Sequence, residues 1–161
     1  MIQAAELREL VIQPALKGIH LYTPEAEELL IATCAQESED GYYLKQTVGG
    51  KNAALGIFQM QPDTHESIWN TTLTKDSSLG FLVLTSCSYT LRPKPDVMVY
   101  NLLYAAVMAR IFWLHVEEPM PAVDDKDRRW YLYKRYWNSY AGKATQQEFE
   151  ANYAKYVKGV K

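Results

Sequence analysis

The chain has 161 residues, 48% of them hydrophobic, with 17 basic and 19 acidic side chains and a net charge of −2. This length and apolar content suit a single domain with a full core and exclude a disordered chain. No apolar run reaches the ~18 residues that cross a bilayer, and the cysteines and histidines lack disulfide-framework or metal-ligand spacing. We therefore expect no membrane span, no metal and no other cofactor.

The first predicted element is an amphipathic helix over residues 3–17, because apolar residues recur there at helical spacing. Pro14 should kink or shorten it. The N-terminus lacks the charged-then-apolar pattern of a secretion signal. We therefore expect a protein made in the cytoplasm without a signal peptide.

The second predicted helix, residues 24–38, begins with a Thr-Pro pair that is typical of a helix start. Counting back from Glu37 by three and by seven gives Cys34 and Leu30, on the face expected to meet the core. Glu37 should therefore point inward, where burial and the negative end of the helix dipole raise its pKa. A carboxyl that stays protonated near neutral pH suits general acid catalysis. The plainer interpretation is a glutamate bonded to a backbone amide or an arginine.

Residues 39–55 are rich in Gly and Tyr and predict loops or a small β-hairpin. Tyr42 and Tyr43 could stack on a ligand or simply pack in the hairpin. The segment GIFQM at residues 56–60 follows, and it can fold back over Glu37. Within it, Gln59 offers both a hydrogen-bond donor and an acceptor. A buried β-like segment without a ligand is the alternative.

Three further helices are expected in the middle of the chain, over residues 62–72, 76–90 and 96–115. The second should be well buried, because four large apolar residues are consecutive from Phe81 to Leu84. The third is apolar on nearly all sides and should lie at the centre of the domain as its longest apolar helix.

The C-terminal part predicts a helix over residues 125–139 and a last helix to about residue 158, which a Thr145–Glu148 capping box opens. The first of these mixes bases with aromatic residues, which can indicate nucleic-acid binding. The acidic net charge argues against that, and a nucleic-acid partner would require a steep salt dependence of affinity. Its Trp130, Tyr133 and Trp137 have helical spacing, which favours core positions.

Two linked motifs resemble the lytic transglycosylase family, which includes soluble lytic transglycosylases and goose-type lysozymes. The pair Glu37-Ser38 is followed by GIFQMQPDT at residues 56–64, and the family signature is Glu-Ser followed by Gly-Leu-Met-Gln-x-x-Pro-x-Thr. The longer string ALGIFQMQPDTHESIW is most similar to phage-encoded members. The positions that match the signature are Gly56, Gln59, Pro62 and Thr64.

The resemblance implies a mainly α, lysozyme-like (α+β) fold in one domain over residues 1–161. It implies a long buried central helix, which begins with an asparagine in the family (here Asn101), and a small β-hairpin or loop region beside the cleft. The string WNSYAG at residues 137–142 resembles, imperfectly, the family's Ala-Tyr-Asn-Ala-Gly motif. The family's cleft tyrosine then corresponds to Tyr136 or Tyr140.

The implied activity is cleavage of the β-1,4 bond between N-acetylmuramic acid and N-acetylglucosamine in peptidoglycan. One glutamate, Glu37, would donate a proton to the leaving oxygen and then act as base while the muramyl 6-hydroxyl attacks, which leaves a 1,6-anhydro end. Glycine at position 56 would let the backbone come close to a sugar. The substrate-binding residues would be Ser38, Gly56, Phe58, Gln59, Met60, Tyr136, Asn138 and Tyr140.

Two alternatives stay open. A hydrolytic lysozyme needs a second carboxylate, for which Asp63 and Glu39 are the candidates. A glycan-binding or virion structural protein could keep the fold without catalysis, although an inactive relative would be expected to lose Glu37 first. In every case the expected partner is the glycan strand of peptidoglycan rather than nucleic acid. Without a signal peptide, access to the cell wall would require a virion or lysis-system partner.

Overall fold

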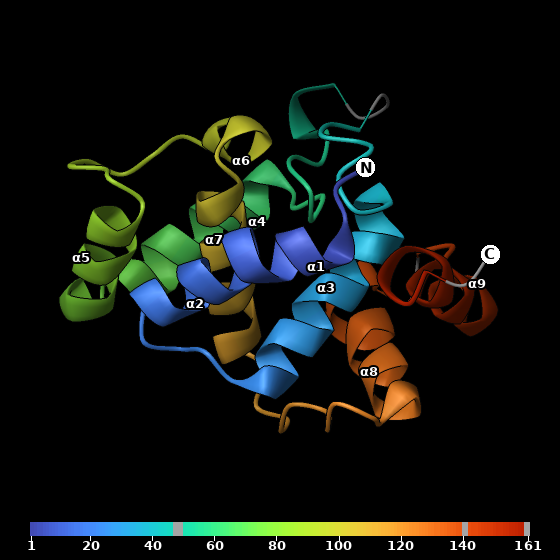
Figure 1. Ribbon diagram of the computed structural model, residues 1–161. Helices are drawn as coiled ribbons and strands as arrows, with labels where there is room; N and C mark the ends of the chain where they lie inside the picture. Colours follow the sequence, from blue (N-terminus) through green and yellow to red (C-terminus); the bar gives the residue numbers. More distant parts are fainter. Residues whose placement is uncertain (47–49, 140–141, 160–161) are drawn as a thin grey trace.

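The computed structural model describes residues 1–46, 50–139 and 142–159, and this part of the chain is mainly helical, as predicted (Figure 1). Several α-helices continue directly into π-helical turns, and one short 3₁₀ turn, η2, spans Gly50–Asn52. The α-helices are α1 (Ala4–Glu6), α2 (Gln13–Gly18), α3 (Pro24–Ser38), α4 (Pro62–Ile68), α5 (Ser77–Ser86), α6 (Val97–Tyr100), α7 (Leu102–Leu114), α8 (Lys126–Leu132) and α9 (Gln146–Asn152). The π-helical stretches are η1 (Leu7–Ile12), η3 (Trp69–Leu73), η4 (Tyr133–Asn138) and η5 (Tyr153–Val157).

Helix α3 crosses the middle of the molecule and contacts η1, α7, α9 and η5 (Figure 1). It begins where predicted, because the Thr23 side chain accepts a hydrogen bond from the amide of Ala26 at 3.0 Å. It ends at Glu39, which has a left-handed φ of 51°. Since most of the helix is buried from Ala26 to Ala35, its C-terminal turn is held in a fixed place.

The N-terminal helix is continuous from Ala4 to Gly18, and just before Pro14 it changes from α-helical to the wider π-helical hydrogen bonding. Proline has no backbone N–H to donate. Immediately before it, the amide of Gln13 donates to the carbonyl of Arg8, five residues back. In place of the predicted kink or early end at Pro14, the helix contains a π-helical segment, η1.

The predicted helix over residues 96–115 is interrupted at Asn101, where φ is −108° and ψ is 95°. The Asn101 side chain accepts from the amide of Tyr104 at 2.9 Å and so caps a second helix, α7. Residues 104–111 of α7 are all buried, and all of them except Arg110 belong to the hydrophobic core, so the centre of the domain is mostly apolar, as expected. The prediction of one helix over residues 96–115 was wrong, because an asparagine cap divides it into α6 and α7. The central helix α7 does begin at Asn101, as the resemblance implied.

Helix α5 is not well buried, contrary to the prediction from its four consecutive apolar residues. It lies at the outer edge of the molecule (Figure 1), where Phe81 is 66% exposed and only Gly80 and Val83 are buried. Consecutive residues of a helix point to different sides. A run of four therefore cannot bury all its members against one neighbour.

The predicted β-hairpin falls partly on residues 47–49, which lie outside the described residues. Among the residues described on either side, isolated antiparallel bridges join Leu55 to Lys45 and to Met60, and no longer strand forms. The hairpin as a whole stays a prediction.

A cluster of paired charges ties α3 to its neighbours. Glu28 accepts hydrogen bonds from Arg8 at 2.7 Å and from Arg129 at 3.4 Å, as well as from the hydroxyl of Tyr153. Arg8 also pairs with Glu27 at 3.0 Å. Buried charges are tolerated only when paired in this way. The cluster therefore fixes η1, α8 and η5 around α3.

None of the helices in the described ranges is both long and apolar enough to cross a membrane.

Candidate active site

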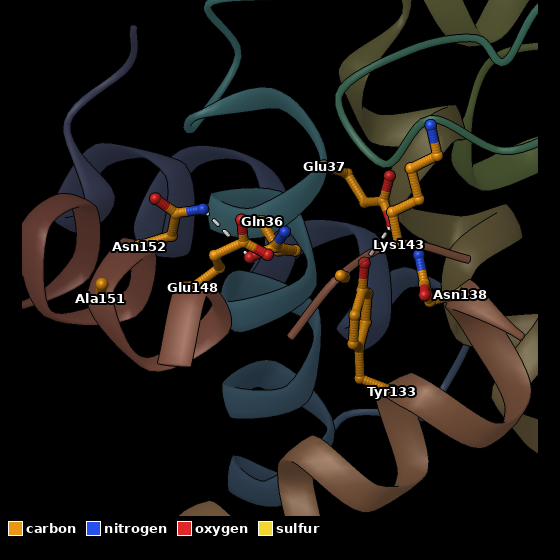
Figure 2. Close-up of a pocket in the computed structure, with 9 residues that line it drawn as sticks. Gln36, Glu37, Tyr133, Asn138, Lys143, Glu148, Ala151 and Asn152 are labelled. Atoms are coloured by element: carbon orange, nitrogen blue, oxygen red, sulfur yellow. Dashed lines mark hydrogen bonds between the residues drawn. The ribbon is translucent and has the colours of Figure 1, made fainter. Parts of the chain in front are cut away.

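Glu37 lies in the last turn of α3, and its carboxylate Oε1 accepts a hydrogen bond of 2.7 Å from the hydroxyl of Tyr133 (Figure 2). Burial raises the pKa of Glu37 to about 7, and the bond from Tyr133 partly opposes this rise. Near neutral pH the carboxyl is therefore shared between its acid and base forms, which is what a group that first gives and then takes a proton requires.

Tyr133 is held firmly under Glu37. It is 1% exposed, its ring stacks on Phe149 of α9 with centroids 4.7 Å apart, and it packs in one cluster with Ala32 of α3. Burial and the nearby charge of Glu37 raise the pKa of Tyr133 far above its usual value. The phenol therefore stays neutral and acts as a hydrogen-bond donor.

The sequence did not single out Tyr133 as a site residue. It was assigned to the core on its helical spacing, and it is indeed buried, but its hydroxyl also reaches Glu37. A signal was available, because a buried tyrosine hydroxyl normally finds a polar partner. Of the two tyrosines proposed instead, Tyr136 donates its hydroxyl to Glu118, and Tyr140 lies outside the described residues.

Hollows open on two sides of Glu37. The first, with a volume of about 520 Å³, runs toward α9 and is lined by Gln36, Tyr133, Glu148 and Asn152, among others (Figure 2). The second, of about 460 Å³, runs toward the 56–64 segment. It is lined by side chains that include Gln59, Met60, Thr64, Phe112, Tyr136 and Trp137. Both are lined by Glu37 and Asn138, so the carboxyl lies where they meet.

A third hollow, of about 430 Å³, continues from the second. The two share Thr64 and Phe112, and the third adds Asp63 and His115. The shared lining residues fix the order of the three hollows along the surface, with Glu37 between the first and the second. The arrangement can accept an elongated ligand that passes Glu37.

The GIFQM segment forms a tight turn. Leu55 and Met60 exchange backbone hydrogen bonds at 2.9 and 3.0 Å, which closes the turn of residues 56–59. The side chain of Gln59 donates to the carbonyl of Gly56 at 2.7 Å. This turn places Gln59 and Met60 on the wall of the second hollow.

Three residues predicted to contact a substrate are instead buried behind the wall. Ser38 is 0% exposed, and its hydroxyl bonds the carbonyl of Cys34 and the amide of Gly41. Phe58 is 1% exposed and belongs to the core. Gly56 has a φ of +73° and faces the carbonyl of Met98. Direct contact with a ligand does not fit this burial, so these residues support the site from behind.

Neither of the two residues predicted as a second carboxylate, Glu39 and Asp63, lines a hollow together with Glu37. Glu39 accepts a hydrogen bond from Tyr156 and lines none of the three hollows. Asp63 lines the third hollow, away from Glu37. Glu148, which the sequence analysis placed only in a capping box, lines the first hollow together with Glu37. Among the acidic side chains that the structure describes, Glu148 is therefore the one that lines a hollow together with Glu37, and its carboxylate also accepts hydrogen bonds from Thr145.

Within the described ranges, no group of three or more His, Cys, Asp or Glu side chains is placed to hold a metal ion. Comparison with known proteins finds no family model, no curated protein and no solved structure that matches this chain. The geometry around Glu37 is therefore the main structural evidence for a function.

Proposed function

We propose that this protein cleaves the glycan strands of peptidoglycan as a lytic transglycosylase with a lysozyme-like fold. The observation that carries the proposal is the position of Glu37, a carboxyl with a pKa near 7 at the meeting point of two hollows. Such a group is able to protonate a leaving oxygen at neutral pH. The motif resemblance at residues 37–38 and 56–64 supplies the substrate class.

In the proposed reaction, protonated Glu37 gives its proton to the oxygen between N-acetylmuramic acid and N-acetylglucosamine as that bond breaks. The resulting carboxylate then takes the proton of the muramyl 6-hydroxyl, while the oxygen of that hydroxyl bonds to the anomeric carbon. The acetamido group of the substrate stabilises the positive anomeric centre between the two steps. The products are a 1,6-anhydro end and a free 4-hydroxyl, and Glu37 regains its proton.

The first prediction is that Glu37→Gln loses at least about 100-fold of the cleavage rate, because glutamine cannot transfer the proton. Purified peptidoglycan is digested with the wild type, with Glu37→Gln and with Glu9→Gln, an exposed glutamate on η1, as control. Mass spectrometry should find 1,6-anhydro-muramic ends with the wild type and the control only. Near-normal activity of Glu37→Gln would contradict the assignment.

A second candidate, hydrolysis, is favoured by one observation: Glu148 lines the same hollow as Glu37. In that reaction a water would replace the 6-hydroxyl, and the products would be heavier by one water. Glu148→Gln separates the two reactions, because glutamine can keep the capping box that Glu148 forms with Thr145. Transglycosylation should survive this change, whereas hydrolysis that uses Glu148 should not.

We further propose that the protein acts on the cell wall and reaches it with a virion or lysis-system partner. If no Glu37-dependent product appears on walls from several bacteria, a glycan-binding or virion structural role replaces the catalytic one.

A further inference from the structure

The two hollows that meet at Glu37 differ in the chemistry of their walls. The second is lined by three aromatic side chains, Phe112, Tyr136 and Trp137, which can pack against the apolar C–H faces of sugar rings. Among the described residues, the first is lined by one aromatic side chain, Tyr133, which is only 1% exposed. Most of its other lining side chains are amides or charged groups. The first hollow therefore suits a ligand rich in hydrogen-bonding groups better than the face of a sugar ring.

Two amide side chains in the first hollow are joined by a hydrogen bond that leaves a donor and an acceptor unused. Nδ2 of Asn152 on α9 donates to Oε1 of Gln36 on α3 at 3.0 Å (Figure 2). Both side chains are half-buried, and among the described residues neither makes another hydrogen bond. Since a carboxamide has both a carbonyl and an NH₂ group, the NH₂ of Gln36 and the carbonyl of Asn152 remain for a ligand. A peptide group, with one C=O and one N–H, complements this amide pair.

Lys143 adds a positive charge to the same hollow. It is exposed, and among the described residues it has no hydrogen-bond or ion-pair partner. Glu148 also lines the hollow, but its carboxylate accepts hydrogen bonds of 3.0 Å from both the amide and the hydroxyl of Thr145. Lys143 is therefore the charge that remains for a ligand, and it favours an anionic group.

We propose that the first hollow binds the peptide stem of a muramyl unit as the glycan strand passes Glu37. The amide pair of Gln36 and Asn152 binds a peptide group of the stem, and Lys143 pairs with one of the stem carboxylates. The proposal takes its substrate class from the function proposed above. An acetamido group of the sugars also offers one C=O and one N–H, but it has no charge to pair with Lys143. The stem is the ligand that uses both features of the hollow.

The test is calorimetric titration with two ligands that distinguish these sources of amide groups, in a Glu37→Gln background so that neither ligand is cleaved. N-acetylmuramyl tetrapeptide carries a stem with carboxylates, whereas a chitin tetramer carries acetamido groups without a stem or a charge. Asn152→Ala should weaken binding of the muramyl tetrapeptide about fivefold to tenfold, because one or two hydrogen bonds are lost. Gln36→Ala should have the same effect and replaces Asn152→Ala if that variant does not fold. The Kd of the chitin tetramer should change less than twofold in both.

Lys143→Met tests the charge separately. It should weaken binding of the muramyl tetrapeptide about threefold at low salt and less at high salt, because the interaction of an exposed charge is screened. The matched controls are Gln147→Ala, on α9, and Lys75→Met. Both residues are exposed and line none of the three hollows, so neither change should alter binding.

Two results would overturn the proposal. One is a muramyl tetrapeptide that does not bind, or that binds equally well to the folded amide variants. The other is an equal loss for the muramyl tetrapeptide and the chitin tetramer, which would assign the amide pair to an acetamido group.

Cleavage assays separate this proposal from the proposed function. If the wild type cleaves peptidoglycan, Asn152→Ala should raise KM several-fold more for intact strands than for strands whose stems an amidase has removed, with little change in kcat. Cleavage without that difference would support the proposed function and count against the stem site. A protein that cleaves nothing, but binds the muramyl tetrapeptide through Asn152, would support the stem site while the proposed function fails.

Discussion

Two carboxyls near the C-terminal end of α3, those of Glu37 and Asp40, have raised pKa values, but they differ in whether they line a hollow. Burial raises the pKa of Asp40 to about 6, against the charge of Arg8, and both its oxygens lack a hydrogen-bond partner among the described residues. Asp40 is 0% exposed and lines none of the three hollows, whereas Glu37 lines two. A raised pKa alone marks burial, and contact with an open hollow distinguishes the residue that a substrate can reach.

At the residue scale, the raised pKa of Glu37 predicts that Glu37→Gln stabilises the protein at high pH. The folded pKa of about 7 exceeds the ordinary glutamate value of 4.5, so between these values the folded state binds more protons than the unfolded one. The contribution of Glu37 to stability is therefore present below pH ~4.5 and is lost as the pH rises past 7. Glutamine has no such loss, so the advantage of the variant should grow to about 1–3 kcal/mol at pH 8.

The measurement is urea unfolding of the wild type and Glu37→Gln at pH 5 and pH 8. Glu9→Gln on the exposed side of η1 serves as control and should show no pH-dependent difference. Because Asp40 is present in all three proteins, its own titration cancels in the comparison. An advantage of Glu37→Gln that is equal at both pH values would show that Glu37 is not held protonated in the fold.

At the element scale, the turn of residues 56–59 packs closely against the backbone of α6, and this contact is possible because residue 56 is a glycine without a side chain. This residue has a φ of +73°, and a Cβ there would overlap the carbonyl oxygen of Met98. Gly56→Ala should therefore lower the free energy of unfolding by about 2–4 kcal/mol, from backbone strain and overpacking together.

Gly50→Ala is the matched control for that prediction. Gly50 also has a positive φ, of 57°, but has no atom within 4 Å of the added carbon, so only the strain of about 1 kcal/mol remains. Both values come from thermal or urea unfolding. Equal losses in the two variants would show that the contact with Met98 does not limit the turn.

Also at the element scale, helix starts were predictable because a cap is local chemistry. Thr23 and Thr145 cap α3 and α9 as their sequences indicated. The family resemblance indicated a helix start at Asn101, where α7 begins, whereas the apolar pattern alone continued through it. The exposure of Phe81 depends on which neighbours α5 lacks. The bond from Tyr133 to Glu37 joins residues 96 positions apart. No local pattern specifies such a pair, which forms only when η4 packs against α3.

At the scale of the whole molecule, the three hollows place Glu37 inside a path rather than at its end. Volumes of about 520 Å³ on one side and about 460 Å³ on the other leave room for a ligand in both directions. A chain that ran along this path would pass α9, then Glu37, then the 56–64 turn and Phe112. Segments from both halves of the sequence therefore form one surface.

For the proposed transglycosylase activity, this path predicts cuts inside glycan strands rather than release of units from an end. The earliest products from long strands should be oligosaccharides of mixed length, separated by chromatography and sized by mass spectrometry. Release of a single short product from the start would contradict the prediction.

Phe112→Leu provides a second measurement, because Phe112 lines both the second and the third hollow. Loss of its ring should raise KM for long strands by about threefold to tenfold, while short strands that end before Phe112 should be cleaved as before.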